Sequence, residues 1–442
     1  MSNSLIIKNG RVIDPSQNID RVTDLVVEDG NISAIDRLDS TYETYEVFDA
    51  TGFIVAPGFI DLHCHLREPG QEYKETIASG TKAAAAGGFT TVCAMPNTEP
   101  PSDNRSVVEF VIKRAREDGC IRVLPIGCVT KGSQGLELSE MADLASAGVV
   151  GFSDDGHPVA DPNIMRQALS YGSGLQLPII NHCEVPELAR GASMNEGWVA
   201  TRLGIKGMPN SAEEVMVARD ISLAELTGGH VHLAHVSTIG TLDLVRGAKA
   251  KNIRISCEIT PHHLTLVDEA VMGMSSENGP FDPLTTKSYD TRAKVNPPLR
   301  STIDMLAMSQ GLKDGTIDFI ATDHAPHSLV DKLSTFEEAA FGISVLETAL
   351  ASSLSLVHEG KIELPLLVSK FTSEPASFLN SNLGTLLPGR PADITVFDPH
   401  ETWKVNTSKF ESKGKNTPLE GKTLKGKVKV TYYSGKKVFQ SI

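Results

Sequence analysis

The most restrictive feature of this chain is a regular alternation, between residue 57 and about residue 325, of short apolar runs with longer segments of helical character. The runs that we interpret as strands are Phe59–Leu66, Thr90–Met95, Ile121–Val129, Val149–Ser153, Leu177–His182, His230–His235, Arg254–Ile259 and Ile317–Thr322. Strands that alternate with helices form parallel sheets, and eight such strands can close into a barrel. The sequence therefore predicts an α/β protein built on a (β/α)8 TIM-type barrel.

Helical segments between these strands are predicted at 106–118, 139–147 and 212–227. The residues of the last segment that recur at helical spacing are Val215, Ala218, Ile221, Leu223 and Leu226. Apolar residues that share one face of a helix are expected to pack against the core. We therefore predict that this face of the 212–227 helix is buried.

Both ends of the chain have a different pattern, in which short strand candidates are separated by tight turns. Asn9-Gly10 and Asp29-Gly30 are typical of two-residue hairpin turns. After Pro391 the β pattern returns in the runs 393–398, 427–433 and 437–440. We predict a small composite β-sandwich domain formed by residues 1–55 and 385–442. The barrel domain, residues 56–384, would be inserted between its two parts.

The composition argues against several classes of protein. With 41 basic and 55 acidic residues the net charge is 41 − 55 = −14, which argues against nucleic acid or an anionic membrane as the main partner. No apolar run approaches the ~20 residues of a membrane helix, and the first residues lack the pattern of a signal peptide. The six cysteines include no CxxC pair, so we interpret them as reduced thiols. We expect a cytoplasmic protein.

Histidine and aspartate recur where the predicted strands end, at the edge of a barrel that usually carries the functional residues. Because side chains alternate along a strand, His63 and His65 share one face while Cys64 takes the other. The polar residues at these ends are His63 and His65, Asn97, Asp154 and Asp155, His182, His235, His262 and His263, and Asp323. Buried carboxylates need partners, so packing alone does not account for such a set.

Four histidines and two aspartates of this set form a candidate metal site. They are His63, His65, His182, His235, Asp155 and Asp323. Imidazole and carboxylate ligands suit one or two divalent ions, with Zn²⁺ as the leading candidate. Taken alone, the His-x-His pair would be interpreted as two half-buried structural histidines, because single motifs often match by chance.

Eight motifs spread along the chain can be compared with known families. They are DLHCHLREPG (61–70), MPNT (95–98), FSDDG (152–156), NHCE (181–184), HLAHVS (232–237), TPHHL (260–264), VNPPLR (295–300) and ATDHAPH (321–327). Together they resemble the dihydroorotase family, bacterial long-chain type, within the amidohydrolase superfamily, over nearly the whole chain. The resemblance implies a zinc-dependent cyclic amidohydrolase. Its expected reaction is the reversible cyclisation of N-carbamoyl-L-aspartate to L-dihydroorotate in pyrimidine (UMP) biosynthesis.

The resemblance also implies a role for each candidate ligand. One metal would be held by His63, His65 and Asp323, and the second by the other two histidines of the site. Asp155 would bridge the two ions, so that two Zn²⁺ per subunit are favoured over one. Asp323 would also carry a proton between the attacking water and the ring nitrogen.

Two ambiguities that the residues leave open are decided by the resemblance. Adjacent strand residues face opposite ways, so Asp154 and Asp155 cannot both point at a metal without a bulge. The motif aligns Asp155 with the ligand position. Strand periodicity also does not show whether His232 or His235 is the metal ligand, and the motif favours His235.

A substrate pocket is expected beside the metal site. The substrate is a dianion before ring closure, so its pocket needs cationic and amide donors; the fork of Arg67 suits a carboxylate. The expected substrate-binding residues are His65, Arg67, Asn97, Asn296, His327, Phe341 and Gly342. The last three rest on the resemblance, and the two asparagines would serve equally well as turn residues. The polar segment from His327 to Gly342 is expected to act as a mobile lid.

Alternatives to this function remain at the level of the sequence. Another cyclic-amide hydrolase, such as a dihydropyrimidinase, hydantoinase or allantoinase, would share the fold. Those relatives usually bridge their metals with a carboxylated lysine, where this chain has an aspartate. An inactive scaffold for aspartate transcarbamoylase would have lost metal ligands that are present here. We expect a homodimer, and aspartate transcarbamoylase is a candidate partner.

Overall fold

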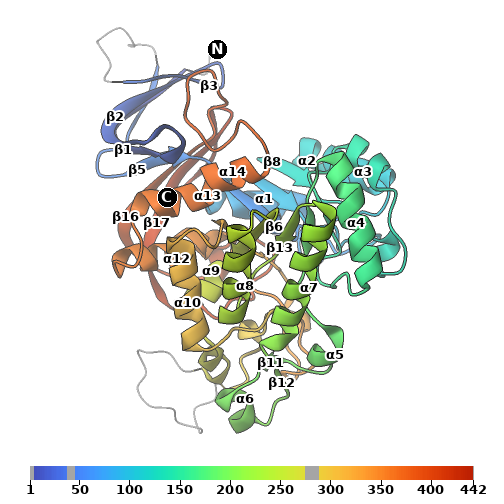
Figure 1. Ribbon diagram of the computed structural model, residues 1–442. Helices are drawn as coiled ribbons and strands as arrows, with labels where there is room; N and C mark the ends of the chain where they lie inside the picture. Colours follow the sequence, from blue (N-terminus) through green and yellow to red (C-terminus); the bar gives the residue numbers. More distant parts are fainter. Residues whose placement is uncertain (1–3, 37–44, 274–287, 442) are drawn as a thin grey trace.

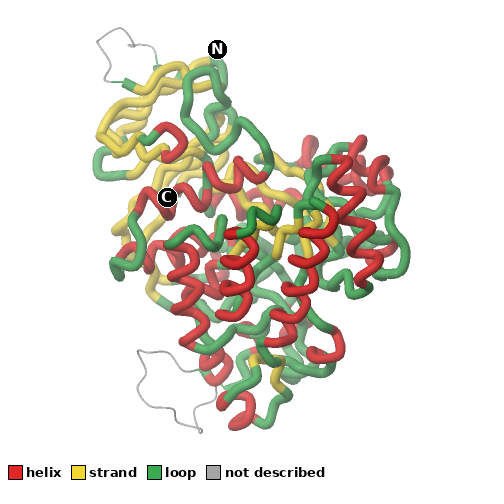
Figure 2. The backbone as a smooth tube through the Cα atoms, viewed as in Figure 1, coloured by secondary structure: helices red, strands yellow, loops and turns green. Residues whose placement is uncertain are grey.

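The structure is a computed structural model that describes residues 4–36, 45–273 and 288–441. A sheet formed by the two ends of the chain lies at the upper left of Figure 1, and a barrel surrounded by helices lies below and to the right of it. Figure 2 shows the same division, with the long strands gathered near the termini and most helices around the barrel. The barrel carries the candidate site, so its construction is described first.

The barrel is built from eight strands that follow one another in sequence. They are β6 (Phe59–Cys64), β7 (Phe89–Ala94), β8 (Arg122–Pro125), β9 (Phe152–Ser153), β10 (Ile179–Asn181), β13 (Val231–Leu233), β14 (Ile255–Ile259) and β15 (Phe319–Ile320). All of the pairings among them are parallel. Two isolated parallel bridges, Gly127 with Phe152 and Cys64 with His324, join the two groups of strands and close the barrel.

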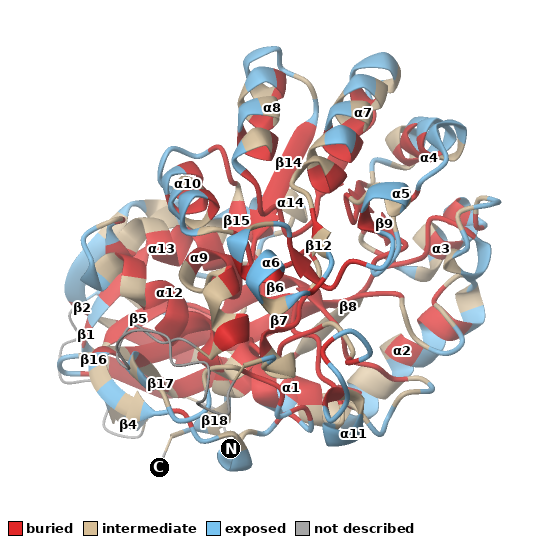
Figure 3. Cartoon of the chain, turned by 90° about the horizontal axis from the view of Figure 1, so that it is seen from below, coloured by how far each residue is buried: buried red, intermediate tan, exposed pale blue. Residues whose placement is uncertain are grey.

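Helices lie around this barrel and in the loops at the ends of its strands. They are α1 (Ile77–Ala86), α2 (Arg105–Asp118), α3 (Met141–Ala147), α4 (Pro162–Leu175), α5 (Pro186–Ala189), α6 (Trp198–Leu203), α7 (Ser211–Thr227), α8 (Ile239–Ala250), α9 (Pro261–Thr265), α10 (Thr302–Lys313), α11 (Leu329–Lys332), α12 (Ala349–His358), α13 (Leu364–Phe371) and α14 (Ser373–Phe378). The short strands β11 (Met194–Asn195) and β12 (Gly207–Met208) pair with each other between β10 and α7. Figure 3 shows the buried strands at the centre and the exposed outer faces of α7, α8 and α10.

Local sequence signals explain where several helices begin. The side chain of Asn104 accepts hydrogen bonds from the backbone N–H groups of Ser106 (3.1 Å) and Val107 (3.3 Å), which starts α2. Asp161 does the same for α4, whose first residue is Pro162. Helices are therefore entered directly from the loops that follow the strands, and those loops hold the candidate site.

The prediction for the buried face of α7 is wrong. Val215 is 54% exposed and Leu226 is 69% exposed, whereas Glu213 and Asp220 are buried. The buried carboxylates have partners: Glu213 accepts from the backbone N–H of Ser237, 3.0 Å away, and Asp220 accepts from the Asn181 amide. Apolar spacing chose the wrong face because paired polar groups can be buried at little cost.

The two ends of the chain form one hydrogen-bonded sheet. Its strands are β1 (Leu5–Asp14), β2 (Ile19–Glu28), β3 (Asn31–Ile35), β4 (Glu46–Asp49), β5 (Ile54–Pro57), β16 (Ile394–Lys404), β17 (Thr423–Tyr433) and β18 (Lys436–Gln440). Strands β5 and β16 pair antiparallel, with Val55 opposite Val396, and so join the N-terminal to the C-terminal part. We retain the division into 1–55 with 385–442 and 56–384 as a proposal for the domain boundaries.

Six of the eight barrel strands stop earlier than predicted, β8 by four residues and the others by one or two, whereas β9 and β14 end at the predicted residue. Strand β10 ends at Asn181, β13 at Leu233 and β15 at Ile320. His182, His235 and Asp323 therefore lie on the first residues of the loops. Within the described ranges, no helix combines the length and the apolar character that crossing a membrane requires.

Candidate metal centre

His63 and His65, at the end of β6, face two carboxylates that come from other strands. His63 Nε2 lies 3.4 Å from Asp155 Oδ2 and 3.6 Å from Asp323 Oδ1. His65 Nε2 lies 3.5 Å from Asp155 Oδ2 and 3.1 Å from Asp323 Oδ1. The two imidazoles and two carboxylates thus converge on one point from β6, β9 and β15.

A second group of ligand atoms lies against the other oxygen of Asp155. His182 Nδ1 is 3.0 Å from His235 Nε2, and Asp155 Oδ1 is 3.3 Å from His235 Nε2 and 3.6 Å from His182 Nδ1. Asp155 therefore presents Oδ2 to the first pair of histidines and Oδ1 to the second. This is the arrangement that a bridging carboxylate requires.

The donor set fits divalent metal ions. In each of two groups, His63–His65–Asp155 and Asp155–His182–His235, the ligand atoms lie within 4.8 Å of one another, and all of these residues are buried. Within the described chain, His63 Nε2 is buried without a hydrogen-bond partner. Buried polar atoms are normally satisfied, so an unpartnered nitrogen aimed at carboxylates and further imidazoles points to a cation.

Electrostatics supports the same interpretation. Burial raises the pKa of Asp155, but the facing imidazoles, His63 foremost, outweigh this and hold the pKa well below the usual range. Burial also raises the pKa of Asp323, and interactions with His65 and His63 again lower it below the usual range. Both aspartates are therefore carboxylates at neutral pH and can act as metal ligands.

The backbone is strained at three positions of the site. Arg67, His235 and Asp323 have left-handed φ angles of 61°, 34° and 44°. Such conformations are uncommon for residues with a Cβ and cluster at functional sites. The left-handed turn at His235 also decides between His235 and His232 as the candidate ligand, because it places the His235 ring in the cluster. His232 instead stays within the strand and contacts Glu258 and Ser256.

Asp154 points away from the cluster. Its Oδ1 accepts hydrogen bonds from the backbone N–H groups of Val129 (2.9 Å) and Thr130 (3.1 Å), and its Oδ2 accepts from the Thr130 hydroxyl. The adjacent Asp155 turns the other way, toward the histidines, although both aspartates lie just beyond the end of β9. The structure thus gives Asp154 a role in holding the loop after β8 to the end of β9.

Glu258 is a residue of the site that the sequence interpretation missed. Its Oε1 lies 2.6 Å from His63 Nδ1, and its Oε2 lies 3.1 Å from His232 Nε2. Burial raises the pKa of Glu258, but interactions with these two histidines outweigh it and lower the pKa to about 2. A carboxylate that accepts from Nδ1 leaves Nε2 of His63 free for a metal. An acidic residue inside the apolar strand β14 was the available signal.

All of the predicted substrate-binding residues lie around one cavity beside the cluster. The cavity has a volume of about 180 Å³ and is lined by His65, Arg67, Asn97, Asn296, His327, Phe341 and Gly342, together with four of the candidate ligands. Two larger surface hollows, of about 630 and 590 Å³, contain none of the predicted site residues. The chemistry of the lining therefore selects the smaller cavity.

Arg67 is the buried cation of this cavity. Its Nε donates to the carbonyl of Pro326 over 3.3 Å, and its Nη2 lies 3.4 Å from His327 Nε2. Burial lowers the pKa of Arg67 to about 10, which leaves the guanidinium charged at neutral pH. No carboxylate is recorded within salt-bridge distance of Arg67 in the described part of the chain, so an anionic ligand can take that place.

The two asparagines contact histidines of the candidate metal site as well as lining the cavity. Asn97 Oδ1 lies 2.8 Å from His65 Nδ1. Asn296 Nδ2 lies 3.2 Å from His182 Nε2 and 2.9 Å from a carboxylate oxygen of Glu184. These amides can therefore hold the imidazole rings in place in addition to the expected contact with substrate.

In the described part of the chain, neither His262 nor His263 makes a hydrogen bond or ring contact with a candidate ligand. His263 lies 2.7 Å from the Thr260 hydroxyl and 3.1 Å from the carbonyl of Pro297, which follows Asn296. His263 is therefore connected to the candidate site through the loop that carries Asn296.

The expected lid contains the short helix α11 and the buried Lys332, whose ammonium donates to the carbonyls of Thr291 and Lys294.

Comparison with known proteins agrees with this geometry. A dihydropyrimidinase from Brevibacillus agri matches the fold with a TM-score of 0.83 at 22% identity, over 99% of this chain and 95% of that one. An L-hydantoinase from Arthrobacter aurescens matches with a TM-score of 0.83 at 24% identity, over 99% and 96%. The predicted fold class, a TIM-type barrel with a β-sandwich domain, is confirmed. At 22% and 24% identity, these two solved structures show a shared fold class.

Sequence relatives narrow this class further. The family model described as Dihydro-orotase-like matches residues 52–240. A dihydroorotase of Syntrophus aciditrophicus is 50% identical over 99% of both chains. A dihydroorotase of Geobacter metallireducens is 49% identical over 99% of this chain and all of its own length. The chain belongs to the dihydroorotase family.

Proposed function

We propose that this protein is a dihydroorotase, which interconverts N-carbamoyl-L-aspartate and L-dihydroorotate in pyrimidine biosynthesis. One observation carries the proposal beyond family membership: the buried guanidinium of Arg67 lines the same cavity as the candidate metal ligands. The substrate combines a carboxylate with the amide that is made or broken. A cation beside a metal site is the pairing that such a molecule requires.

The candidate ligands are assigned to two ions. His63, His65 and Asp323 would hold one ion, and His182 and His235 would hold the other, with Asp155 between them. We propose Zn²⁺ for both, because the set contains only imidazole and carboxylate groups. Bound there, the metal would lower the pKa of a water molecule and polarise the amide carbonyl.

Asp323 is proposed as the proton carrier. It is ionised, it lines the cavity, and one of its oxygens lies 3.1 Å from His65 Nε2. In hydrolysis, Asp323 would accept a proton from the attacking water and donate it to the ring nitrogen that leaves. In ring closure, the same proton would move in the opposite direction.

The substrate carboxylate is assigned to Arg67, whose planar fork can donate two parallel hydrogen bonds. His327 and the backbone at Phe341 and Gly342 line the same cavity and would complete the contact. The side-chain amides of Asn97 and Asn296 would make hydrogen bonds with the part of the substrate that lies away from its carboxylate. The cavity walls are largely buried, which strengthens each of these polar contacts.

The surroundings of the enzyme are also proposals. We propose that it works in the cytoplasm as a homodimer, and that aspartate transcarbamoylase is the protein to test first as a partner. Light scattering measures the mass of the protein alone, which tests the homodimer, and its mass after mixing with aspartate transcarbamoylase, which tests that partner. A monomer that does not bind it would contradict them without affecting the assignment of the reaction.

The reaction is tested by measuring turnover of L-dihydroorotate, dihydrouracil and allantoin, with the metal content determined on the same sample. Dihydrouracil lacks the carboxylate, so it would leave the Arg67 guanidinium unpaired. Sites built around such a contact reject the analogue by about 10⁴-fold. Equal or faster turnover of dihydrouracil or allantoin would contradict the proposed substrate.

The ligand assignment is tested with His63→Ala and His182→Ala, one from each group. Both should lower kcat by orders of magnitude and reduce bound metal, because no neighbouring side chain replaces the missing imidazole. His358→Ala, at the exposed end of α12, is the matched control and should change neither quantity. Full activity with unchanged metal in both site variants would overturn the assignment.

A further inference from the structure

The connection between β16 and β17 reaches from the terminal sheet to the barrel. Its residues 410–417, which we call the 410–417 segment, pack against the loop that follows β15. A Cβ added to Gly414 would lie 2.4 Å from Pro326 Cβ and 2.6 Å from Ser344 Oγ. Real Cβ atoms do not approach so closely, so only glycine allows this contact. The segment therefore touches the same loop that carries Asp323 and His327.

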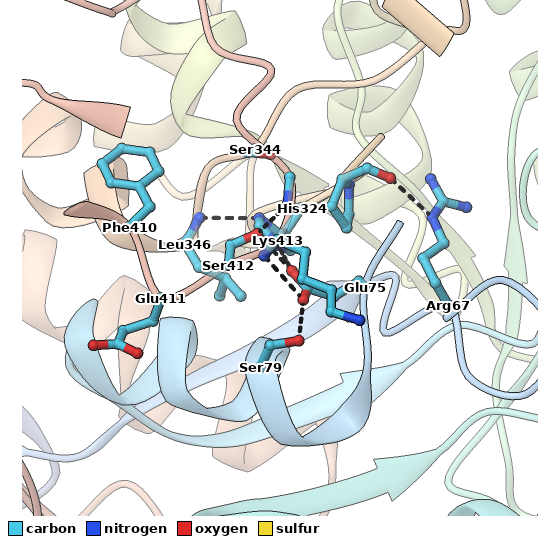
Figure 4. A network of polar contacts seen from close by, with 12 residues as sticks. Arg67, Glu75, Ser79, His324, Ser344, Leu346, Phe410, Glu411, Ser412 and Lys413 are labelled. Atoms are coloured by element: carbon cyan, nitrogen blue, oxygen red, sulfur yellow. Dashed lines mark hydrogen bonds and ion pairs between the residues drawn. The ribbon is translucent and has the colours of Figure 1, made fainter. Parts of the chain in front are cut away.

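Two carboxylates of the barrel hold the first half of this segment. Glu75 accepts from the Ser412 hydroxyl over 2.5 Å and from the backbone N–H of Lys413 over 3.2 Å, as Figure 4 shows from close by. Glu347 accepts from the backbone N–H groups of Glu411 (3.1 Å) and Ser412 (3.2 Å). These four hydrogen bonds attach the first half of the segment to the barrel domain.

Asn416, at the end of the segment, uses its whole side chain to join two loops. Its Oδ1 accepts from the backbone N–H of His327 (2.9 Å) and from the Ser344 hydroxyl (2.8 Å). Its Nδ2 donates to the carbonyls of Ala325 and Gly342, each 3.0 Å away. The amide can make four hydrogen bonds and makes all of them here. It is buried, with 4% of its surface exposed.

The two loops joined by Asn416 carry one wall of the cavity. In the first loop, the carbonyl of Pro326 accepts from Arg67 Nε, and His327 Nε2 lies 2.8 Å from the carbonyl of Phe341 in the second. The two loops also pair directly, with Ala325 N donating to Ile343 O over 2.9 Å. Asn416 itself is not among the residues that line the cavity.

We propose that Asn416 is a positioning residue for substrate binding, contributed by the C-terminal part of the chain. It sets the spacing between the Ala325–His327 and Phe341–Ser344 loops, and through Pro326 it sets the position of the Arg67 guanidinium. The identity of the ligand, a substrate carboxylate, rests on the proposed function. The positions of the two loops do not.

The proposal is tested with Asn416→Ala, and Asn406→Ala is the matched control. Asn406 lies on the same connection and is exposed, and its side-chain oxygen accepts from the backbone N–H and the hydroxyl of the neighbouring Ser408. We expect Asn416→Ala to raise KM for dihydroorotate about tenfold while kcat stays within about threefold, because the lost contacts act on binding of the carboxylate. Metal content should be unchanged. A smaller folded fraction would lower kcat and leave KM unaltered, so the two causes are separable.

Hydrogen exchange provides a readout that does not depend on activity. Without substrate, Asn416→Ala should speed exchange of the amides in 325–328 and 341–345, and Asn406→Ala should not. If Asn416→Ala does not fold, Ser344→Ala, which removes one of the four bonds, takes its place and should raise KM about two- to threefold. Unchanged exchange, or an unchanged KM, would overturn the positioning role. Absence of dihydroorotate turnover in the unmodified enzyme, together with faster exchange in the variant, would instead reject only the proposed function.

Discussion

Replacing Glu258 by glutamine tests whether the buried carboxylate behind His63 supports metal binding. A carboxylate only accepts hydrogen bonds, so both imidazole nitrogens that face Glu258, His63 Nδ1 at 2.6 Å and His232 Nε2 at 3.1 Å, must carry hydrogens. Glutamine has one carbonyl oxygen and can serve only one of them. Its NH₂ group would then face the N–H of the other ring.

The expected magnitude follows from this mismatch. A buried donor left without an acceptor costs about 1–3 kcal/mol. Loss of a partner behind a metal-binding histidine typically costs 10- to 100-fold in metal affinity, which corresponds to about 1.4–2.7 kcal/mol. The two ranges agree, so we expect Glu258→Gln to weaken Zn²⁺ binding by about 10- to 100-fold.

Competition with a chelator of known affinity measures this change, with metal content determined at several concentrations of free Zn²⁺. Asp14→Asn is the matched control, because Asp14 is also fully buried and accepts backbone N–H groups, but in the terminal sheet. It should lower the thermal stability without changing the metal affinity. A Glu258→Gln enzyme with wild-type Zn²⁺ affinity and wild-type kcat would refute the reasoning.

Three further predictions concern the ligands and the cavity. Asp155→Asn should remove metal and lower kcat by orders of magnitude, whereas Asp154→Asn should mainly lower Tm; the reverse order in metal analysis and melting curves would show that the register after β9 is misassigned. Arg67→Lys should raise KM for dihydroorotate with metal retained, because a point charge cannot replace a planar fork; unchanged steady-state kinetics would exclude the contact. Hydrogen exchange of the amides in 328–340 should be faster in Lys332→Met, because the substitution removes an ammonium that donates to backbone carbonyls. Bound substrate should slow the exchange of the same amides, and equal exchange in all states would reject the lid.

Much of this architecture was predictable from the sequence. Parallel barrel strands are buried on both faces, so they appear as short continuous apolar runs, and the alternation with helices implies their order. Strand ends that carry His and Asp, such as His63 and His65 on β6, were recognisable because a barrel gathers those ends at one edge. The choice of Asp155 over Asp154 needed the family resemblance, since alternation excludes one of the pair without saying which.

Other features were decided only by the tertiary structure. The buried face of α7 contains Glu213 and Asp220, and no local pattern reveals that their partners lie on other loops. The ring of His235 enters the cluster through a left-handed turn beyond the end of β13, where strand periodicity no longer applies.

Two sets of long-range contacts between buried polar groups were not visible in the sequence. Glu258 meets a histidine 195 positions away, and Asn416 joins loops 72 to 91 positions away. The sequence determines local conformation and the set of reactive groups, because both depend on neighbouring residues and on chemical type. Which buried polar group faces which depends on how the strands and loops close in space. Only the tertiary structure therefore decided the partners that hold the candidate metal ligands and the wall of the cavity in place.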